Sequence, residues 1–483
     1  MQALVLKELE VIKAQTAENM MQSIGGAQHY SIAQLEKMGS EGLLAGMNLT
    51  GYNLDSINLA GDNLKGTNFT GDQMIGAQLN GADMQGAEIS HADLTCSNLS
   101  GANLSGDAFS GTTLITANLE GANLQGISAT GANFESAITS STTNLEHAQL
   151  SGDTFSGDMG ADYTSSSFSN CHFEQGVQLS GNFSSANMQG AQLSGSIMDG
   201  NFHGANMQGI DLSNASISVA NFSGANLESA NFSGANGDAN FGGADLDHAN
   251  MSGANLMGSS LSGAHVVDTN LTNTSLQDVN ASNVDFTKAV MDGTSFYGAN
   301  LSGDNFSNTN LSKDGVNLQW ASGTDVNFSG ATMTGMNLTN LALTNSNLDN
   351  ADMDGVHGKV IIEGCHFDGA DLSNADLAGS VIMSSHFDGA NLENANFSGI
   401  NQGSMTAPDD SFKDADLQHA NFDGAELSGS NMNGANAQYA NFDYSDLTNV
   451  TWREANVTCA TFEGAAGNIP WVKEAMFQEL EAV

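Results

Sequence analysis

The chain has 483 residues and a formal net charge of −44, because 54 Asp and Glu residues are balanced by only 10 Lys and Arg residues. A surface of this sign repels nucleic acids and anionic lipids, since both are bound mainly through Lys and Arg. We therefore expect no direct binding of DNA or RNA. No apolar run approaches the roughly 18 residues of a membrane span, and none is expected.

The expected location is the cytoplasm. The N-terminal stretch carries Lys7, Glu8 and Glu10 within its apolar residues, unlike a secretory signal. The 4 cysteines lie far apart with no CxxC pair, which argues against a disulfide framework or a structural zinc site and favours a reducing compartment. Delivery by a specialised secretion system remains compatible with the sequence.

Residues 1–45 are predicted to be helical and to act as an N-terminal cap or anchor. Apolar residues recur at helical spacing between Leu4 and Met20, and Gly25-Gly26 interrupt the pattern. Ser31 is placed to cap a second short helix that runs to Met38.

Residues 46–465 form a repeat with a period of five. The stretch 220–236 reads ANFSGANLESANFSGAN, in which a large apolar residue stands at every fifth position and a small residue two places before it. In extended backbone these two residues face the same side, while the Asn or Asp between them faces the other. We call each five-residue repeat unit a word; its Gly or Ser supplies a corner.

A second period of 20 residues lies over the first. Phe422, Phe442 and Phe462 are spaced by 20, and Trp452 belongs to a second series with the same spacing. If four words complete one turn, each series forms a column in which neighbours are about one strand spacing apart, roughly 4.8 Å. These four residues are therefore predicted to lie in core columns.

The words ADLSNADL, ANLENANF and GANLQG resemble the A-[DN]-[LF]-x-x words of pentapeptide-repeat proteins. The resemblance implies an all-β solenoid, a right-handed quadrilateral β-helix, here of about twenty coils with short helical segments at both ends. Residues 466–483 are predicted to form a C-terminal capping helix. In the family such a helix often joins two copies head to head, so we expect either a simple cap or a homodimer through the terminal helices; the contact residues would be Trp471, Val472, Phe477 and Leu480.

The period breaks at several places, where loops escape the packing rule of the repeat. The candidate loop contacts are Trp320, Asp409 and Asp410, and the alternative is that the breaks are tolerated irregularities. The breaks fall at 137–145, 155–163, 316–328, 353–362 and 401–412, and Phe202 and Phe241 each arrive one residue early.

One pair of words offers a weak metal candidate. His366 with Asp368 and His386 with Asp388 are twenty residues apart, so the two imidazoles should stack on one outer face with the carboxylates close by. The alternative is a duplicated turn with an outward ladder. No cofactor is expected.

We expect no enzyme. Carboxylate pairs such as Asp245 and Asp247 face outward, whereas general acid–base catalysis needs a concave, partly dry site that separates their pKa values. The surface of a filled β-helix is convex.

The acidity has two interpretations. From Gly66 to Thr287 there are 21 Asp and Glu residues and no Lys or Arg, which gives about one charge per 2.5 Å of axis against about 1.7 Å in duplex DNA. The resemblance implies a DNA mimic, since some pentapeptide-repeat proteins occupy the DNA-binding surface of type II topoisomerases. The other interpretation is solubility, because uniform charge keeps repetitive faces apart.

The sequence thus favours a non-catalytic protein-interaction scaffold with a strongly acidic surface and an unspecified protein partner. The alternatives are a modulator or protector of a type II topoisomerase such as DNA gyrase, and a structural spacer or delivered bacterial effector. The acidic surface residues are Asp83, Asp93, Glu120, Glu135, Glu228, Asp245 and Asp247.

Overall fold

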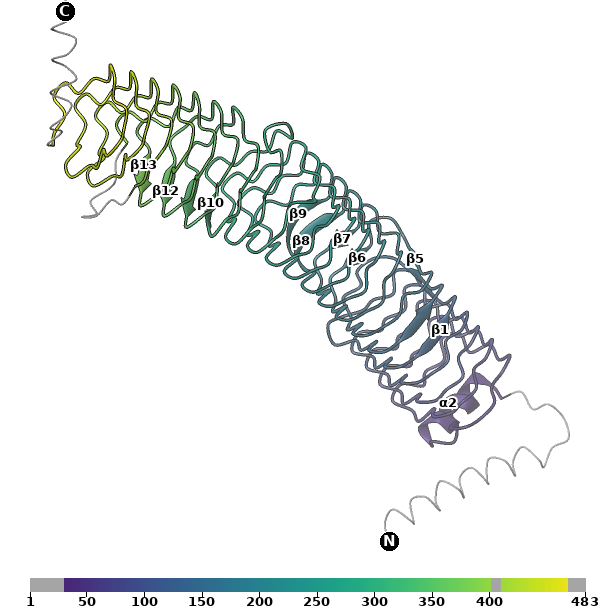
Figure 1. Ribbon diagram of the computed structural model, residues 1–483. Coiled ribbons are helices and arrows are strands. Elements are labelled where there is room, and N and C mark those ends of the chain that lie inside the picture. The colour runs from purple at the N-terminus through teal and green to yellow at the C-terminus, as the bar shows by residue number, and fades with distance from the viewer. Residues whose placement is uncertain (1–29, 401–409, 468–483) are drawn as a thin grey trace, which may run out of the picture. The chain divides into compact units, whose positions relative to one another are not determined.

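The computed structural model describes residues 30–400 and 410–467. The chain divides into two compact units, Met1–Asn240 and Phe241–Val483. Each unit is a stack of coils with parallel pairing between neighbours (Figure 1). The predicted first helix and the predicted C-terminal helix lie outside the described residues.

One short helix, α2 (Ile32–Ser40), precedes the first coil of unit 1. Ser31 caps it through a capping box with Gln34, as the sequence predicted. Leu35 is buried, and Gly39 lies against Leu59 of the first coils, so the helix covers the otherwise open start of the solenoid. Among the described residues, no helix has the length and apolar character to cross a membrane.

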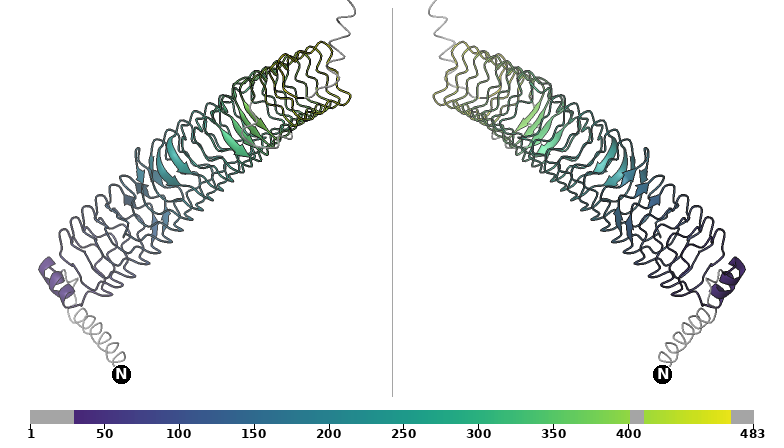
Figure 2. Two further views of the ribbon diagram at one scale, coloured as in Figure 1. Left: turned by 90° about the vertical axis from the view of Figure 1, so that its left-hand side faces the viewer. Right: turned by 90° about the vertical axis from the view of Figure 1, so that its right-hand side faces the viewer.

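The coil is four-sided. Asn48, Asn53, Asn58 and Asn63 stand five residues apart, and each is bridged in parallel to the residue twenty positions later. Four words therefore make one turn, and every residue lies above its counterpart in the next coil. The two views in Figure 2 show this stacking of coil on coil within each unit. The predicted solenoid of parallel-paired words is confirmed.

The assigned strands are short and all pair in parallel. Unit 1 has a pair β1-β3, a three-stranded sheet β2-β4-β5 and a four-stranded sheet β6-β7-β8-β9, while unit 2 has the sheet β10-β11-β12-β13. In unit 1 the strands are β1 (Ser128–Thr130), β2 (Asn133–Phe134), β3 (Gln149–Ser151), β4 (Thr154–Phe155), β5 (His172–Phe173), β6 (Gln178–Leu179), β7 (Ile197–Met198), β8 (Ser216–Asn221) and β9 (Asn236–Asn240). In unit 2 they are β10 (Ser322–Thr324), β11 (Ala342–Thr344), β12 (Ile361–Glu363) and β13 (Val381–Met383).

The sequence predicted about twenty coils. The assigned strands do not count these coils, because many words of the described coils are joined to the next coil through single bridged residues and contain no assigned strand.

The core consists of the inward columns. Phe442 stacks on Phe422 with ring centroids 5.2 Å apart and on Phe462 with centroids 5.3 Å apart, and Trp452 meets Phe442 edge-on at 5.3 Å. These distances equal about one strand spacing, as expected for residues twenty apart. The predicted core column is confirmed, although Phe462 near the end of the described coils is only half-buried.

The Asn between the two inward residues holds the corner. In Asn182, Oδ1 accepts the N–H of Ser184 at 3.2 Å, and Nδ2 donates to Asp162 Oδ1 in the preceding coil at 3.1 Å. The side chain thus satisfies a backbone donor that the parallel ladder leaves free, and it also joins two coils. This double role explains why Asn and Asp recur at this position of the word.

The phase breaks change the length of a coil but keep the columns aligned. Asn123 is bridged to Asn144, which is 21 residues away, and Asn144 to Asp162, which is 18 away. Further on, Ser295 pairs with Asn317 and His386 with Ser411, over 22 and 25 residues. In the coils that are described throughout, the extra or missing residues are absorbed at the corners, because the backbone hydrogen bonds between coils fix the flat sides.

Besides Asp410, which is described below, four carboxyl groups point into the core at the position of the small residue. Asp107 Oδ1 accepts the N–H of Ala87 at 3.1 Å, and Asp304 Oδ1 accepts the N–H of Val284 at 2.8 Å. In each of the four, Oδ2 is buried and has no hydrogen-bond partner among the described residues. Burial raises the pKa to about 6 in Asp72, about 7 in Asp153 and about 8 in Asp107 and Asp304.

The aromatic column predicts a large and local loss of stability. Phe442→Ala should lower the free energy of unfolding by about 3–5 kcal/mol, because it removes a fully buried ring from two stacks. Phe442→Leu should cost less, and Tyr444→Ala, at an exposed side chain, should stay within about 0.5 kcal/mol. Urea unfolding followed by circular dichroism measures all three, and equal losses at positions 442 and 444 would contradict the stacked core.

The inward carboxyl groups predict that stability falls as the pH rises. In the folded chain Asp107 and Asp304 keep a proton up to about pH 8, whereas the ordinary pKa of an Asp is 3.8. The unfolded chain therefore releases protons that the folded chain holds, so the free energy of unfolding decreases between about pH 4 and pH 8.

Asp107→Asn and Asp304→Asn should flatten this decrease. The Asn oxygen still accepts the backbone N–H, and no charge develops in the core as the pH rises. The measurement is urea unfolding at pH 5, 7 and 8, with the outward Asp93→Asn as control. A pH dependence that is unchanged in both core variants would show that these groups do not hold their protons.

Candidate functional site

A groove of about 580 Å³ lies at one corner of unit 1. At this corner, three successive coils each have a step of four residues instead of five between neighbouring large inward residues. The steps run from Met159 to Tyr163, from Leu179 to Phe183 and from Met198 to Phe202. The next coil restores the fifth residue at Val219, where the pairing of β8 with β9 shifts register and the side chain is 75% exposed. The groove therefore lies where the corner is shortened, next to a coil in which the corner has its full number of residues.

Glycine is required where the shortened coils touch. A Cβ on Gly181 would lie 2.2 Å from the carbonyl oxygen of Ala161, and a Cβ on Gly200 would lie 2.6 Å from that of Gly181. Both contacts are with backbone atoms, which cannot move aside without breaking the ladder. The two glycines thus let the shortened words stack and open the corner to solvent.

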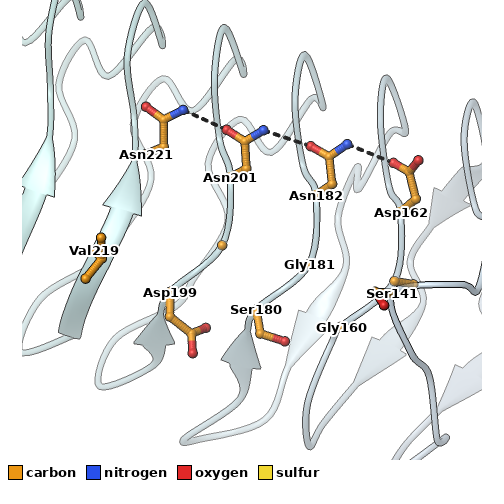
Figure 3. Close-up of a pocket in the computed structure, with 12 residues that line it drawn as sticks. Ser141, Gly160, Asp162, Ser180, Gly181, Asn182, Asp199, Asn201, Val219 and Asn221 are labelled. Atoms are coloured by element: carbon orange, nitrogen blue, oxygen red, sulfur yellow. Dashed lines mark hydrogen bonds between the residues drawn. The ribbon is translucent and has the colours of Figure 1, made fainter.

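An amide ladder forms one side of the groove. Asn221 donates to Asn201 Oδ1 at 2.9 Å, Asn201 donates to Asn182 Oδ1 at 3.1 Å, and Asn182 donates to Asp162 Oδ1 at 3.1 Å (Figure 3). Each amide is oriented by its hydrogen bond to the neighbouring side chain. The ladder ends at Asp162, whose carboxylate can only accept hydrogen bonds. The side is pre-organised and presents acceptors at the Asp162 end.

Asp199, Ser180 and Val219 lie along the other side, and Ser141 stands at the far end (Figure 3). Asp199 Oδ2 accepts from Gln178 Nε2 at 2.8 Å, while Oδ1 has no hydrogen-bond partner among the described residues. The Ser180 hydroxyl is bonded to Asp158 Oδ1. Two carboxylates, Asp162 and Asp199, thus line the groove, and a third, Asp158, lies behind the Ser180 hydroxyl. The sequence from Gly66 to Asn240 contains no Lys or Arg.

The predicted acidic surface residues all lie outside the core, and several take part in the ladders. Asp83 is 3.0 Å from Lys65 Nζ, Asp93 accepts from the Thr95 hydroxyl, and Glu228 accepts from Gln208 Nε2 at 2.7 Å. The described residues at the remaining predicted positions are exposed or half-buried: Glu120, Glu135, Asp245 and Asp247.

The predicted metal pair forms a ladder. The rings of His366 and His386 stack with centroids 5.0 Å apart and planes 12° apart. Asp368 Oδ1 accepts the N–H of Asp388 at 3.1 Å, which holds the carboxylate against the backbone. Among the described residues these four groups do not converge on one point, whereas Asp245, Asp247 and His265 do.

The three predicted loop contacts differ in where the structure places them. Trp320 is exposed at a corner with φ 62°, which fits a contact residue. Asp410 was expected in an exposed loop, but it is 1% exposed and accepts the N–H of Ser385 at 2.8 Å, because it occupies the inward small-residue position two places before Phe412. Asp409 and the predicted helix contacts Trp471, Val472, Phe477 and Leu480 lie outside the described residues.

The groove was not among the sites predicted from the sequence. The shortened words at 155–163 and the early Phe202 are phase breaks of the repeat, but the predicted breaks did not include the third word, Leu179–Phe183, or the alignment of the three. The detectable signal was the replacement of the inward Ala by Gly181 and Gly200, combined with spacings of 19 residues between paired positions.

Three solved structures illustrate the kinds of protein that the chain resembles. QnrB1, a plasmid-mediated fluoroquinolone resistance protein, is 15% identical over 55% of this chain and 97% of its own, with a TM-score of 0.18. HetL from Nostoc sp. strain PCC 7120, involved in heterocyst differentiation regulation, is 24% identical over 59% and 90%, with a TM-score of 0.12. A pentapeptide repeat protein from the Arabidopsis thaliana thylakoid lumen is 30% identical over 23% and 67%, with a TM-score of 0.14.

These TM-scores are too low to carry an argument, and no curated protein matches the chain. The family is shown by a sequence model of pentapeptide repeats (8 copies), which matches nine partly overlapping segments that together cover more than half of the chain. The matched residues are 73–106, 109–138, 117–157, 201–236, 237–273, 274–312, 324–357, 362–399 and 411–449. Its coils of four five-residue words agree with this match, and the chain belongs to the pentapeptide-repeat family.

Proposed function

We propose that the protein is a non-catalytic interaction scaffold that binds a basic surface of a protein partner. The observation that carries the proposal is the corner groove, which presents Asp162 and Asp199, with Asp158 behind Ser180, in a segment that contains no Lys or Arg. In this proposal a Lys or Arg side chain of the partner enters the groove, and the surrounding acids steer the approach of the partner.

The outward charge of unit 1 supports this function. Between Gly66 and Asn240 there are 16 Asp and Glu residues. Asp72, Asp107 and Asp153 point into the core, so removing these three leaves 13 acids outside it. None of the 13 can pair with a Lys or Arg of the same segment, because the segment has neither. Apart from Asp83, which is paired with Lys65, the outward acids of this segment are therefore available to an incoming cation.

The groove is better suited to a cationic group than the rest of the face. Asp162 closes an amide ladder on one side of the groove, and Asp199 lies along the other side (Figure 3). A guanidinium offers five N–H donors in a fixed plane, so it can serve several of these acceptors together. The partly enclosed corner also screens the interaction less than the open sides do.

The proposal is tested with a fluorescein-labelled hexa-arginine peptide and the full-length chain. Neutralising the groove with Asp158→Asn, Asp162→Asn and Asp199→Asn should weaken binding at least tenfold. A tenfold change corresponds to about 1.4 kcal/mol, less than one charge-assisted hydrogen bond at about 1.5–3 kcal/mol. Fluorescence anisotropy measures the affinity.

The matched control removes the same charge elsewhere on the face, through Glu120→Gln, Glu135→Gln and Glu228→Gln. This control should weaken binding by a few-fold at most, since it changes only the long-range field. Equal losses in the two triple variants would reject the groove as the binding site and leave only diffuse attraction. Urea unfolding of both variants checks that the fold is intact.

A type II topoisomerase is the second candidate partner, supported by the same cation-free face. The eight coil steps from Asn68 to Asn226 span about 38 Å at the strand spacing. The 11 outward acids of this stretch therefore stand roughly 3.5 Å apart along the axis, against about 1.7 Å in duplex DNA. This spacing is wider than the sequence alone indicated, because three of the acids are in the core.

Mimicry predicts that the purified chain changes the supercoiling activity of DNA gyrase at low salt and less so at high salt, because screening weakens the competition with DNA. The chain with all six substitutions of the two triple variants should have a smaller effect. A supercoiling assay at two salt concentrations decides the question. Unchanged activity at low salt would remove the topoisomerase as a partner.

A further inference from the structure

We propose that Asp245, Asp247 and His265 form a binding site for a divalent transition metal ion of the Zn²⁺ class. Each residue offers one ligand atom, and these atoms all lie within 4.8 Å of one another. Ligands bound to one Zn²⁺ at about 2.0–2.2 Å are separated by roughly 3–4 Å, so small side-chain rotations bring the three atoms to bonding distance. The site lies in unit 2, away from the corner groove.

The solenoid brings the three residues together. Asp245 and Asp247 flank the inward Leu246 and therefore point out of the same side of one coil. His265 lies in the next coil and is bridged in parallel to Asp245. The N–H of His265 donates to the carbonyl of Ala244 at 3.0 Å, which fixes the vertical distance between the coils.

The two carboxylates are already oriented by the backbone. Asp245 Oδ1 accepts the N–H of Asp247 at 3.1 Å, and Asp247 Oδ1 accepts the N–H of Val267 in the neighbouring coil at 2.8 Å. A carboxylate keeps further acceptor capacity after one such bond, so each can also bind a metal. Hydrogen bonds that hold ligands in place raise the affinity of a metal site.

The donor set selects the kind of ion. One imidazole nitrogen and two carboxylate oxygens suit Zn²⁺ or a similar first-row ion, whereas Ca²⁺ prefers six to eight oxygen ligands. Two carboxylates also balance the charge of a divalent cation. Three protein ligands leave coordination positions for water or for a group from a bound molecule.

An adjacent pair provides a matched control. His248 Nδ1 lies 3.7 Å from Asp268 Oδ2, on the same two coils as the proposed ligands. His248 and Asp268 do not belong to the converging group. His248→Ala therefore removes an exposed imidazole beside the site and leaves the three ligands in place.

The test is isothermal titration of Zn²⁺ into the full chain after treatment with a chelator. We expect one site per chain that is tighter than the diffuse binding to surface acids. His265→Ala should weaken it at least tenfold, Asp245→Asn with Asp247→Asn should abolish it, and His248→Ala should leave it unchanged. A Ca²⁺ titration should be weaker and insensitive to His265→Ala, because Ca²⁺ does not use the imidazole.

Co²⁺ gives a second readout, since its visible spectrum reports an imidazole ligand directly. We expect a spectrum in the wild-type chain and in His248→Ala that is lost in His265→Ala. Urea unfolding of each variant confirms that these exposed substitutions preserve the fold. Equal Zn²⁺ affinity in the wild-type chain and in His265→Ala, or loss of the site in His248→Ala, would overturn the proposal.

Discussion

The parallel hydrogen bonding between successive coils is the constraint on which the rest of each unit depends. A backbone bond from each side of one coil to the next, as from Leu49 N–H to the carbonyl of Asn68 at 2.8 Å, fixes the step between coils at about one strand spacing. Every side chain then meets its own counterpart in the neighbouring coil. Rings must stack on rings inside, and amides on amides outside, as in the Phe422 and Phe442 pair and the Asn182 and Asn201 pair.

This constraint explains how acids divide between core and surface. An Asp at the outward position accepts a neighbouring N–H and stays accessible to water, whereas an Asp at the small inward position, such as Asp107, loses its solvation and holds a proton towards neutral pH. Asp therefore contributes a negative charge at the outward position of the word, whereas at the small inward position it stays protonated towards neutral pH. The surface field of unit 1 is weaker than its acid content indicates, since three of those acids lie inside.

It also explains why both candidate sites arise from residues in different coils. The groove needs three shortened words directly above one another, and the proposed metal site needs His265 directly beside Asp245. In each case a local sequence change becomes a site only because the coils keep their register. A solenoid with sliding coils would scatter the same residues.

The sequence by itself determined the five-residue word, the period of twenty, the inward columns and the helix that begins after Ser31, because each depends on spacing along the chain. It could not determine which irregular words align, since insertions and deletions between Ala137 and Phe202 change the offset between paired residues from 21 to 18 to 19. Those offsets are settled by inter-coil hydrogen bonds. Only the tertiary structure therefore decided that Asp410 is buried and that three short words open one groove.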